Sequence, residues 1–438
     1  MSSMRPGTPI AAAFAGAILL FAATPVEANG YLDPAWMRTF GGGGADQGWG
    51  VEVGPGGEVY LVGFVQGQGN DVFVARIEAS GSVAWERTIG RPLSQKGFEI
   101  VYAGGFLYVG GVTQRDGRIE SQDMYVLKLS PSNGTLVWES TWNGPADLYD
   151  EADGIVVEDG IVFASGWADV RLDYTQGQVA LVKFADADGT PVQNATWGGA
   201  GRDGADGSMA SDGTNLYVSG ITGGVNLITG GDVLVAAFNQ TTLSEVWNAT
   251  WGGSAFDDGL GLTIRGRNLY VAGLTLSFGD DGILLLDYDL DGNLVWNTTW
   301  GGAGSESARA VEVAENGSAV FVAGQTGSFG NGSNDVVLLE FSPDGEIISY
   351  RTWGGAGSDV TQGIAVTGDA IYLAGNRAVQ GFDTDAFAMR IDPNGSGPPG
   401  TDGDRPPLNP AAFLLAVIVV VAVVLVILSL FVTRRRST

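Results

Sequence analysis

The chain has 438 residues and a net charge of −27, with 45% apolar residues, 70 glycines, and neither cysteine nor histidine. The acidic excess argues against nucleic acid or anionic lipid as the main partner, because both attract Lys and Arg. Without cysteine there can be no disulfide, and without histidine the chain lacks the usual general base at neutral pH and the commonest metal ligand.

The first 28 residues predict a secretory signal peptide. Arg5 precedes a mostly apolar run over residues 10–23, and Val26-Glu27-Ala28 is typical of a cleavage site. We therefore expect the residues that follow to lie outside the cell.

Residues 31–392 contain seven units that share one phrase. In it a Thr is followed by an aromatic or apolar residue and a Gly-rich turn, and the Thr returns at intervals of 49 to 55 residues. Its positions are Thr39, Thr88, Thr141, Thr196, Thr250, Thr299 and Thr352. A period near 50 is typical of a propeller blade of four short strands.

Each unit reads as four strands. A short apolar strand, such as 48–53, is expected to be innermost, and the next strand carries the pattern aromatic-x-x-Gly in every unit. A glycine at a fixed place in a strand indicates a bend or a close backbone approach. An alternating third strand and a turn rich in Asp, Asn and Gly precede the closing strand.

The seventh unit has no closing strand of its own, whereas an orphan closing strand, 35–40, precedes the first unit. If the orphan completes the last blade, the ring closes without an exposed sheet edge. The prediction is an all-β, seven-bladed propeller with four-stranded blades, closed by an N-terminal strand.

Most tryptophans lie in the closing strands. Side chains alternate along a strand, so Trp296 and Trp300 share one face and can cover the neighbouring blade. We interpret them as inter-blade packing rather than as a platform for stacking sugars. The set is Trp36, Trp85, Trp138, Trp142, Trp197, Trp247, Trp251, Trp296, Trp300 and Trp353.

These units resemble the SBBP, or β-propeller repeat, family. The similar phrases are Thr352-Trp353-Gly354-Gly355-Ala356-Gly357-Ser358-Asp359 and Tyr270-Val271-Ala272-Gly273-Leu274-Thr275. The resemblance implies a propeller on an exported bacterial or archaeal protein and carries no established catalytic residues. Gly134-Thr135-Leu136-Val137-Trp138 is also similar to a phrase of quinoprotein propellers, which we interpret as shared blade packing.

The chain beyond the propeller predicts an anchor. A Pro/Gly/Asp-rich linker, 393–410, leads to an uncharged apolar stretch, 411–432, that is long enough to span a membrane as one helix. The tail, 433–438, contains three arginines, which favour the cytoplasmic side. We expect a single-pass cell-surface protein with an extracellular N-terminal domain.

Acidic residues recur seven positions after the repeated Thr. They are Asp46, Asp203, Asp257, Glu306 and Asp359. Unit two has Gln95 there, and unit three is displaced by an insertion that contains Asp147, Asp150 and Asp153. Such a ring at the channel mouth could bind calcium, but we favour carboxylates that satisfy backbone amides in their own turns.

The segment 287–292 looks like a calcium loop. An EF-hand loop would need a carboxylate at its twelfth position, where this chain has Thr298, so we favour an ordinary hairpin turn. We expect no cofactor, with calcium as the one alternative.

Eight Asn-x-Ser/Thr sequons are candidate acceptors for N-glycosylation. They begin at Asn133, Asn194, Asn239, Asn248, Asn297, Asn316, Asn331 and Asn394.

These features favour a non-enzymatic binding or adhesion module that recognises an extracellular protein or glycan. Irregular insertions, such as 115–122 and 168–177, are where we expect the partner site. Two alternatives stay open, a carbohydrate-active enzyme that uses paired carboxylates at the channel mouth and a structural coat component. A raised pKa in one acid pair that the other units lack would favour the enzyme.

Overall fold

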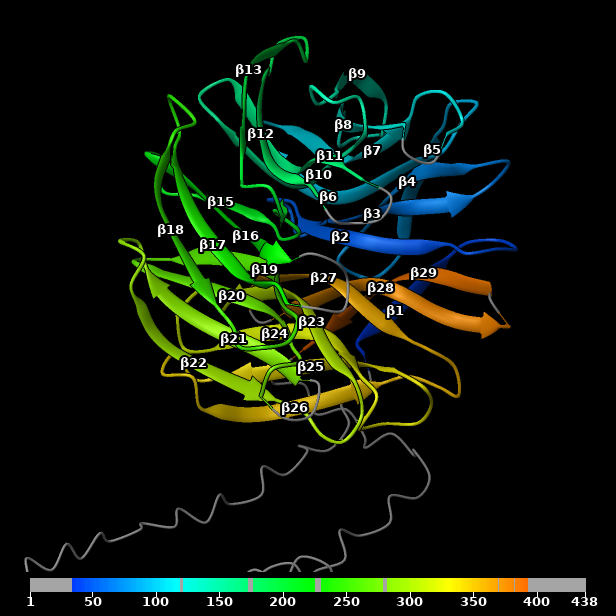
Figure 1. The fold of residues 1–438 in the computed structure, drawn as a ribbon. Coiled ribbons are helices and arrows are strands. Elements are labelled where there is room, and N and C mark those ends of the chain that lie inside the picture. Colours follow the sequence, from blue (N-terminus) through cyan, green and yellow to red (C-terminus); the bar gives the residue numbers. More distant parts are fainter. Residues whose placement is uncertain are drawn as a thin grey trace, which may run out of the picture. The chain divides into compact units, whose positions relative to one another are not determined.

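A computed structural model describes residues 34–392 apart from 119–120, 172–175, 225–229, 279–281, 369 and 382. The regular elements in this part of the chain are β-strands, grouped in seven sheets (Figure 1). None of the described residues form a helix long and apolar enough to cross a membrane. The predicted signal peptide, linker, membrane span and tail all lie outside the described residues.

The first three blades follow the chain. Blade 1 comprises β2 (Gln47–Val53), β3 (Val59–Gln66), β4 (Asn70–Ile77) and β5 (Val83–Ile89). Blade 2 comprises β6 (Gln95–Ala103), β7 (Phe106–Gln114), β8 (Gln122–Leu129) and β9 (Leu136–Trp142). Blade 3 comprises β10 (Tyr149–Glu158), β11 (Ile161–Val170), β12 (Gln178–Ala185) and β13 (Pro191–Trp197).

Blade 4 differs from the predicted four strands because its innermost strand is interrupted. Both β14 (Arg202–Gly204) and β15 (Met209–Ser211) pair with β16 (Asn215–Gly224), and β17 (Asp232–Asn239) and β18 (Glu245–Trp251) complete the sheet. The interruption spans residues 205–208, four residues where the equivalent part of blade 5 has three, 259–261.

Blades 5 to 7 complete the ring. Blade 5 comprises β19 (Asp257–Arg265), β20 (Asn268–Thr275), β21 (Gly282–Asp289) and β22 (Leu294–Trp300). Blade 6 comprises β23 (Glu306–Val313), β24 (Val320–Thr326), β25 (Asp335–Phe341) and β26 (Ile347–Trp353). Blade 7 comprises β27 (Val360–Thr367), β28 (Ala370–Gln380), β29 (Asp383–Ile391) and the N-terminal β1 (Trp36–Phe40).

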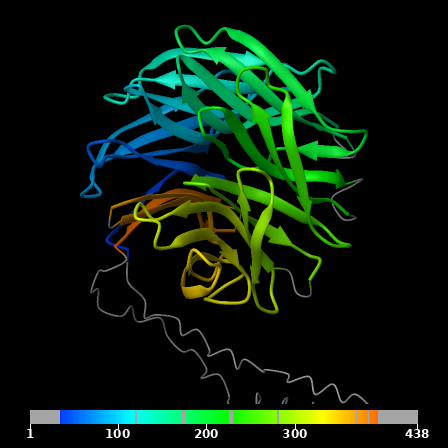
Figure 2. The ribbon, with the colours of Figure 1, turned by 90° about the vertical axis from the view of Figure 1, so that its left-hand side faces the viewer.

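The predicted closure of the ring is confirmed. β1 pairs antiparallel with β29 over its whole length, from Trp36 opposite Arg390 to Phe40 opposite Ala386. Figures 1 and 2 show the blue N-terminal strand lying beside the orange C-terminal strands. Because Trp36 and Phe40 are buried, this strand also contributes to the core between blades 7 and 1.

The innermost strands surround the axis. β2 contacts β6, β6 contacts β10, and the contacts continue through β15, β19, β23 and β27 back to β2. Each blade is an antiparallel meander, so all seven innermost strands begin on the face where the chain crosses from one blade to the next. We call this the crossover face.

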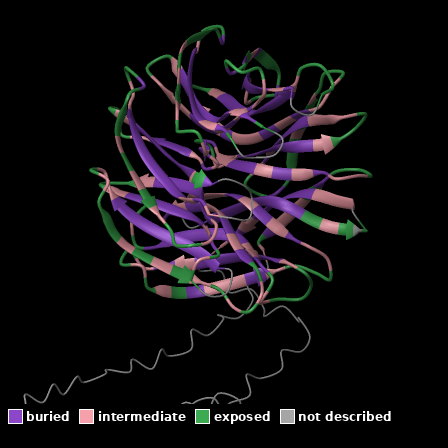
Figure 3. Ribbon diagram, in the orientation of Figure 1, coloured by how far each residue is buried: buried purple, intermediate pink, exposed green. Residues whose placement is uncertain are grey.

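The core lies between the blades. Apolar residues of adjacent sheets form shared clusters, such as that of Tyr270, Ile283 and Leu285 in blade 5 with Val322 and Val337 in blade 6. Figure 3 shows burial concentrated in the middle strands, whereas loops and parts of the outer strands are exposed.

Candidate functional site in the central channel

Every innermost strand carries a β-bulge at the same place. The register of six strands shifts immediately after a small residue, for example between Gly97 and Glu99 in β6 and between Ala308 and Ala310 in β23. The same shift interrupts β2, β10, β19 and β27. In blade 4 it falls in the break between β14 and β15. Because a bulge re-aims one side chain, seven equivalent residues can be presented to the channel.

The repeated glycine of the second strand allows this bulge. A Cβ built on Gly273 would lie 1.9 Å from the carbonyl oxygen of Asp258, and one on Gly63 would lie 1.9 Å from that of Gln47. The equivalent distance is 1.9–2.1 Å in the other five blades, at Gly111, Gly166, Gly220, Gly324 and Gly375. The close backbone approach predicted from the pattern is therefore present in all seven blades.

The bulged residues differ from blade to blade. In chain order they are Trp49, Phe98, Asp153, Asp206, Leu260, Arg309 and Gln362, which we call the bulge ring. The residue before each of them is small and mostly buried: Gly48, Gly97, Ala152, Ala205, Gly259, Ala308 and Thr361. Thus the small residue before the bulge is repeated from blade to blade, whereas the bulged residue that faces the channel varies.

Side chains of the bulge ring meet across blades. The rings of Trp49 and Phe98 are 4.8 Å apart, and the Arg309 guanidinium lies 5.6 Å from the centre of the Trp49 ring. Asp153 and Asp206 lie together in the opposite sector. The ring therefore has an aromatic and basic side and an acidic side.

A cavity of about 470 Å³ extends from the bulge ring towards the face opposite the crossover face. Trp49, Phe98 and Arg309 line it together with three carboxylic acids, Glu52, Glu99 and Glu312. Its volume falls within the usual range for small-ligand pockets.

The cavity acids are held towards their neutral forms. Burial raises the pKa of Glu52 to about 8, against a backbone hydrogen bond from Tyr102 and with some contribution from Glu312. Burial, and next the charge of Glu52, raises the pKa of Glu99 to about 8. Burial also raises the pKa of Glu312. Glu52 and Glu312 occupy equivalent positions opposite Tyr60 and Phe321, whereas blade 2 has Val101 there, so the acid is not a feature of every unit.

A second acidic group lies nearer the crossover face. One carboxylate oxygen each from Glu151, Asp153 and Asp206 lies within 4.8 Å of the others. Asp258 on the neighbouring β19 joins them, since burial, and next the charge of Asp206, raises the pKa of Asp258. We call these four residues the acid cluster.

Sequence reasoning placed Asp153 in an insertion and did not select the other members of either acidic group. The available signal was the third residue after each repeated acid or its equivalent Gln95. The side chain there varies between units, with Asp in both units three and four, while the residue before it stays small. Only the bulge shows that this position turns towards the axis.

The predicted acidic ring is not brought together in the described structure. Each acid accepts a hydrogen bond from a backbone N–H in its own Gly-rich turn, at 2.6–3.1 Å. The donors are Gly42 for Asp46, Gly199 for Asp203, Gly253 for Asp257, Gly302 for Glu306 and Gly355 for Asp359. These contacts match the interpretation of carboxylates that satisfy their own turns.

Units two and three contain equivalents of these acids. Gln95 accepts a hydrogen bond from the Arg91 N–H at 2.7 Å, and Asp150 accepts one from Gly144 at 2.8 Å. Asp150 is fully buried and also accepts from the Asp169 N–H. The insertion in unit three therefore lengthens the turn and leaves its acid in place.

The segment 287–292 forms the hairpin between β21 and β22. Asp287 is buried on β21 and accepts a hydrogen bond from Asn268 at 2.7 Å. Asp289 accepts from the N–H groups of Asp291 and Asn293, which is a hydrogen-bonded turn.

The closing-strand tryptophans reach across to the next blade. The Trp296 indole N–H donates to the Pro343 carbonyl at 3.1 Å, and a Cβ on Gly345 would meet the same indole at 2.7 Å. Trp36, Trp85, Trp138 and Trp247 make the equivalent hydrogen bond. Gln193 occupies this position in blade 3 and donates to Thr242.

Trp197 and the second tryptophans of the closing strands also contact their surroundings. Trp197 donates to Glu245, Trp251 packs on Phe278 and Trp300 packs on Phe329 and Tyr350. Trp142 is buried, and Trp353 borders the core between blades 6 and 7.

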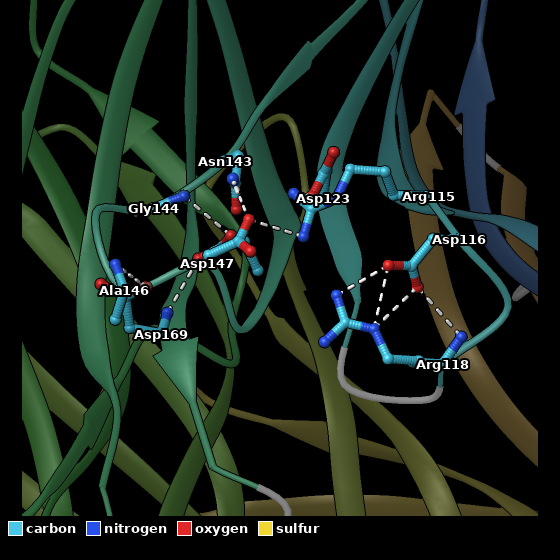
Figure 4. Close-up of polar contacts among 10 residues, drawn as sticks. Arg115, Asp116, Arg118, Asp123, Asn143, Gly144, Ala146, Asp147 and Asp169 are labelled. Carbon is cyan, nitrogen blue, oxygen red and sulfur yellow. Dashed lines mark hydrogen bonds and ion pairs between the residues drawn. The ribbon is translucent and has the colours of Figure 1, made fainter.

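The insertions form a charged connection between blades 2 and 3 on the crossover face (Figure 4). Arg115 bridges Asp123 of blade 2 at 2.8 Å and Asp147 of the crossover to blade 3 at 2.7 Å. Asp147 has φ +61°, and Asn143 donates to its side chain. Ion pairs therefore tie the β7–β8 connection of blade 2 to the crossover that leads to blade 3.

The sequons lie at several places on the propeller. The Asn side chains at 133, 194, 248, 297, 316 and 331 are exposed, and Asn239 is half-buried. Asn394 lies outside the described residues.

The chain matches no known protein family, and no curated protein matches it. Solved structures do match. The Pan2 WD40 domain of Neurospora crassa is 10% identical with a TM-score of 0.51, over 84% of this chain and 99% of that one.

Two further solved structures match over comparable lengths. The WD40 propeller domain of Doa1 is 13% identical with a TM-score of 0.48, over 80% of this chain and 95% of that one. The quinohemoprotein alcohol dehydrogenase of Comamonas testosteroni is 9% identical with a TM-score of 0.46, over 85% and 78%. Of the three, only the Pan2 domain has a TM-score above 0.5, and at 10% identity that likeness supports the propeller fold alone.

Proposed function

We propose that this chain is a membrane-anchored extracellular propeller that works as a non-enzymatic binding module of the SBBP kind. Its bulge ring would hold a small polar group of the partner, such as the terminal sugar of a glycan. The anchor rests on the apolar stretch 411–432 and the arginines that follow it.

One observation carries the proposal. At the bulge, seven equivalent positions bear six types of side chain, with Asp in both blades 3 and 4. The small residue and the glycine that build the bulge recur in every blade, and the acid recurs in six of them. A purely architectural channel would need no such difference. An asymmetric ring with stacked aromatics on one side and carboxylates on the other suits an asymmetric ligand.

The test is a glycan array probed with the full chain purified in detergent. We expect saturable binding to a subset of sugars, and Trp49→Ala should weaken it about tenfold or more, because the ring loses its largest contact surface. Phe278→Ala is the matched control, since that ring is 58% exposed on a connection outside the channel. No binding, or binding that Trp49→Ala leaves unchanged, would contradict the proposal.

The enzyme alternative also has a specific observation, namely two cavity acids with raised pKa values, Glu52 and Glu99, which the other blades do not repeat as a pair. Hydrolysis of an array sugar that Glu52→Gln and Glu99→Gln abolish would favour this function. Ordered self-association without sugar binding would instead favour the coat component.

A further inference from the structure

We propose that the acid cluster of Glu151, Asp153, Asp206 and Asp258 binds one divalent cation of the calcium class in the central channel. This inference does not depend on the proposed function, because it concerns a site that would form whether the partner is a glycan, a protein or a substrate.

The spacing of the cluster fits such an ion. Oxygen atoms of Glu151, Asp153 and Asp206 lie within 4.8 Å of one another. Calcium takes oxygen ligands at about 2.3–2.6 Å, so two ligands on opposite sides of one ion are at most about 5 Å apart. The three residues come from adjacent blades, and an ion between them would join blade 3 to blade 4.

Neighbouring donors orient two of the carboxylates. The Tyr149 hydroxyl donates to one oxygen of Glu151, and the Trp167 indole N–H donates to one oxygen of Asp206. Hydrogen bonds of this type to one oxygen fix the direction of the other and are typical of the residues around a metal site. Trp167 and Trp49 are the two tryptophans outside the closing strands. Trp49 lines the cavity, and Trp167 is buried and reaches the cluster through its indole N–H.

Asp258 gives an independent indication of a ligand. Its side chain is only 4% exposed, and its Oδ1 has no hydrogen-bond partner among the described residues. The same is true of Oδ2 of Asp153. A buried carboxylate oxygen without a partner is costly, and the charge of Asp206 adds to the cost of ionising Asp258. A cation between the two carboxyls would satisfy both oxygens.

The nearby Lys and Arg side chains do not take the place of a bound cation in the acid cluster. Lys96 and Arg309 act on the cluster from blades 2 and 6, but neither comes within ion-pair distance of a carboxylate in the described part of the chain. The Lys96 ammonium lies 4.9 Å from the centre of the Phe64 ring, and the Arg309 guanidinium lies over Trp49. Arg202 of blade 4 also acts on Asp258, and its guanidinium lies 4.9 Å from the centre of the Trp167 ring. Among the described residues, four carboxylates therefore share a site in which none of them forms an ion pair.

The donor set selects the class of ion. Carboxylates are the only ligating side chains here, and the chain has no histidine or cysteine to favour zinc or copper. Magnesium requires shorter bonds of about 2.0–2.1 Å in near-octahedral geometry. Carboxylate oxygens up to 4.8 Å apart therefore fit calcium better than magnesium.

The experiment uses the full chain, stripped with a chelator and purified in detergent. Terbium replaces calcium as a luminescent probe, and Trp167 next to Asp206 can sensitise its emission. We expect sensitised emission that calcium displaces, and a calcium-dependent rise in melting temperature that NaCl of equal ionic strength does not reproduce.

Two substitutions locate the site. Asp153→Asn and Asp206→Asn should each weaken calcium affinity at least tenfold, yet in chelator both variants should melt at or above the wild-type temperature, because each removes a carboxyl that is costly to ionise beside the other acids. Asp287→Asn is the matched control, since Asp287 is buried on β21 outside the cluster and begins the other calcium-like segment. Its affinity should equal that of the wild type.

The proposal would be overturned if calcium neither displaced terbium nor stabilised the wild type beyond NaCl up to about 10 mM, tenfold above the weakest extracellular calcium modules. It would equally be overturned if both cluster variants, folded by circular dichroism, bound calcium as the wild type does. Loss of binding in Asp287→Asn alone would move the site to the hairpin and reject the cluster.

Discussion

At the scale of single residues, the glycine of the aromatic-x-x-Gly pattern determines what each blade can present to the axis. Its missing Cβ leaves room for the carbonyl of the inner strand, and that approach accompanies the bulge in every blade. The aromatic residue three positions earlier is buried between blades, as Tyr270 is at 4% exposure. The glycine of the pattern thus contacts the inner strand of its own blade, whereas the aromatic residue packs against the adjacent blade.

We expect Gly273→Ala to destabilise the propeller by about 4 kcal/mol or more, because the new Cβ would overlap the Asp258 carbonyl and neither backbone can move freely. The urea midpoint of unfolding measures the effect. Gly42→Ala is the control, since a Cβ there meets nothing within 4 Å. A loss below about 1 kcal/mol for Gly273→Ala would show that the strands can separate at the bulge.

At the scale of elements, β1 connects the two ends of the ring. It covers the edge of β29, buries Trp36 and Phe40, and donates the Trp36 indole N–H to Ala79 in blade 1 at 3.1 Å. Arg38 adds a hydrogen bond to the Gly81 carbonyl. Without this strand, β29 would be an exposed edge and blades 7 and 1 would lose their shared packing.

Deletion of residues 34–40 should therefore leave a chain that unfolds at a much lower temperature or aggregates. A permuted chain that carries residues 34–40 after residue 392 is the control, because it restores the strand without the link to the N-terminus. We expect its melting temperature, followed by circular dichroism, to lie close to that of the wild type. Similar melting temperatures of the deleted and the intact chains would show that the propeller is stable without β1.

At the scale of the whole molecule, the seven blades bring acids from distant parts of the sequence to one axis. Glu52, Glu99 and Glu312 come from blades 1, 2 and 6, and the cluster acids come from blades 3, 4 and 5. Burial raises the pKa of Glu151, Asp153 and Asp258 in the cluster as well. The channel therefore binds protons more tightly in the folded protein than in the unfolded chain.

This difference makes the free energy of unfolding depend on pH. A carboxyl whose pKa is raised from 4.5 to about 8 stabilises the fold fully below pH 4.5 and loses that contribution as the pH rises through 8. We expect the domain to be most stable near pH 5 and to lose roughly 2 kcal/mol or more by pH 9, less than the full linkage value because the side chains line a solvated channel.

Urea unfolding of wild type and Glu52→Gln between pH 5 and 9, in chelator, measures this dependence. Glu52→Gln should flatten the curve, whereas Glu86→Gln, at an exposed site on β5, should keep the wild-type slope. Stability that rises from pH 5 to 9 would contradict the assignment of neutral acids to the channel.

The sequence by itself determined the ring. The spacing of Thr39 to Thr352, the aromatic-x-x-Gly pattern and the orphan strand 35–40 predicted seven blades and their closure, because these features repeat along the chain and depend on local strand geometry. Only the tertiary structure decided the site. Asp206 looks like any other acid near a Gly-rich turn until the bulge turns its side chain towards the axis. Its proximity to Glu151 and Asp153 depends on how blades 3 and 4 pack against each other, which no local pattern encodes. The repeated acids, by contrast, lie in their own turns, because a backbone N–H a few residues away satisfies each of them first.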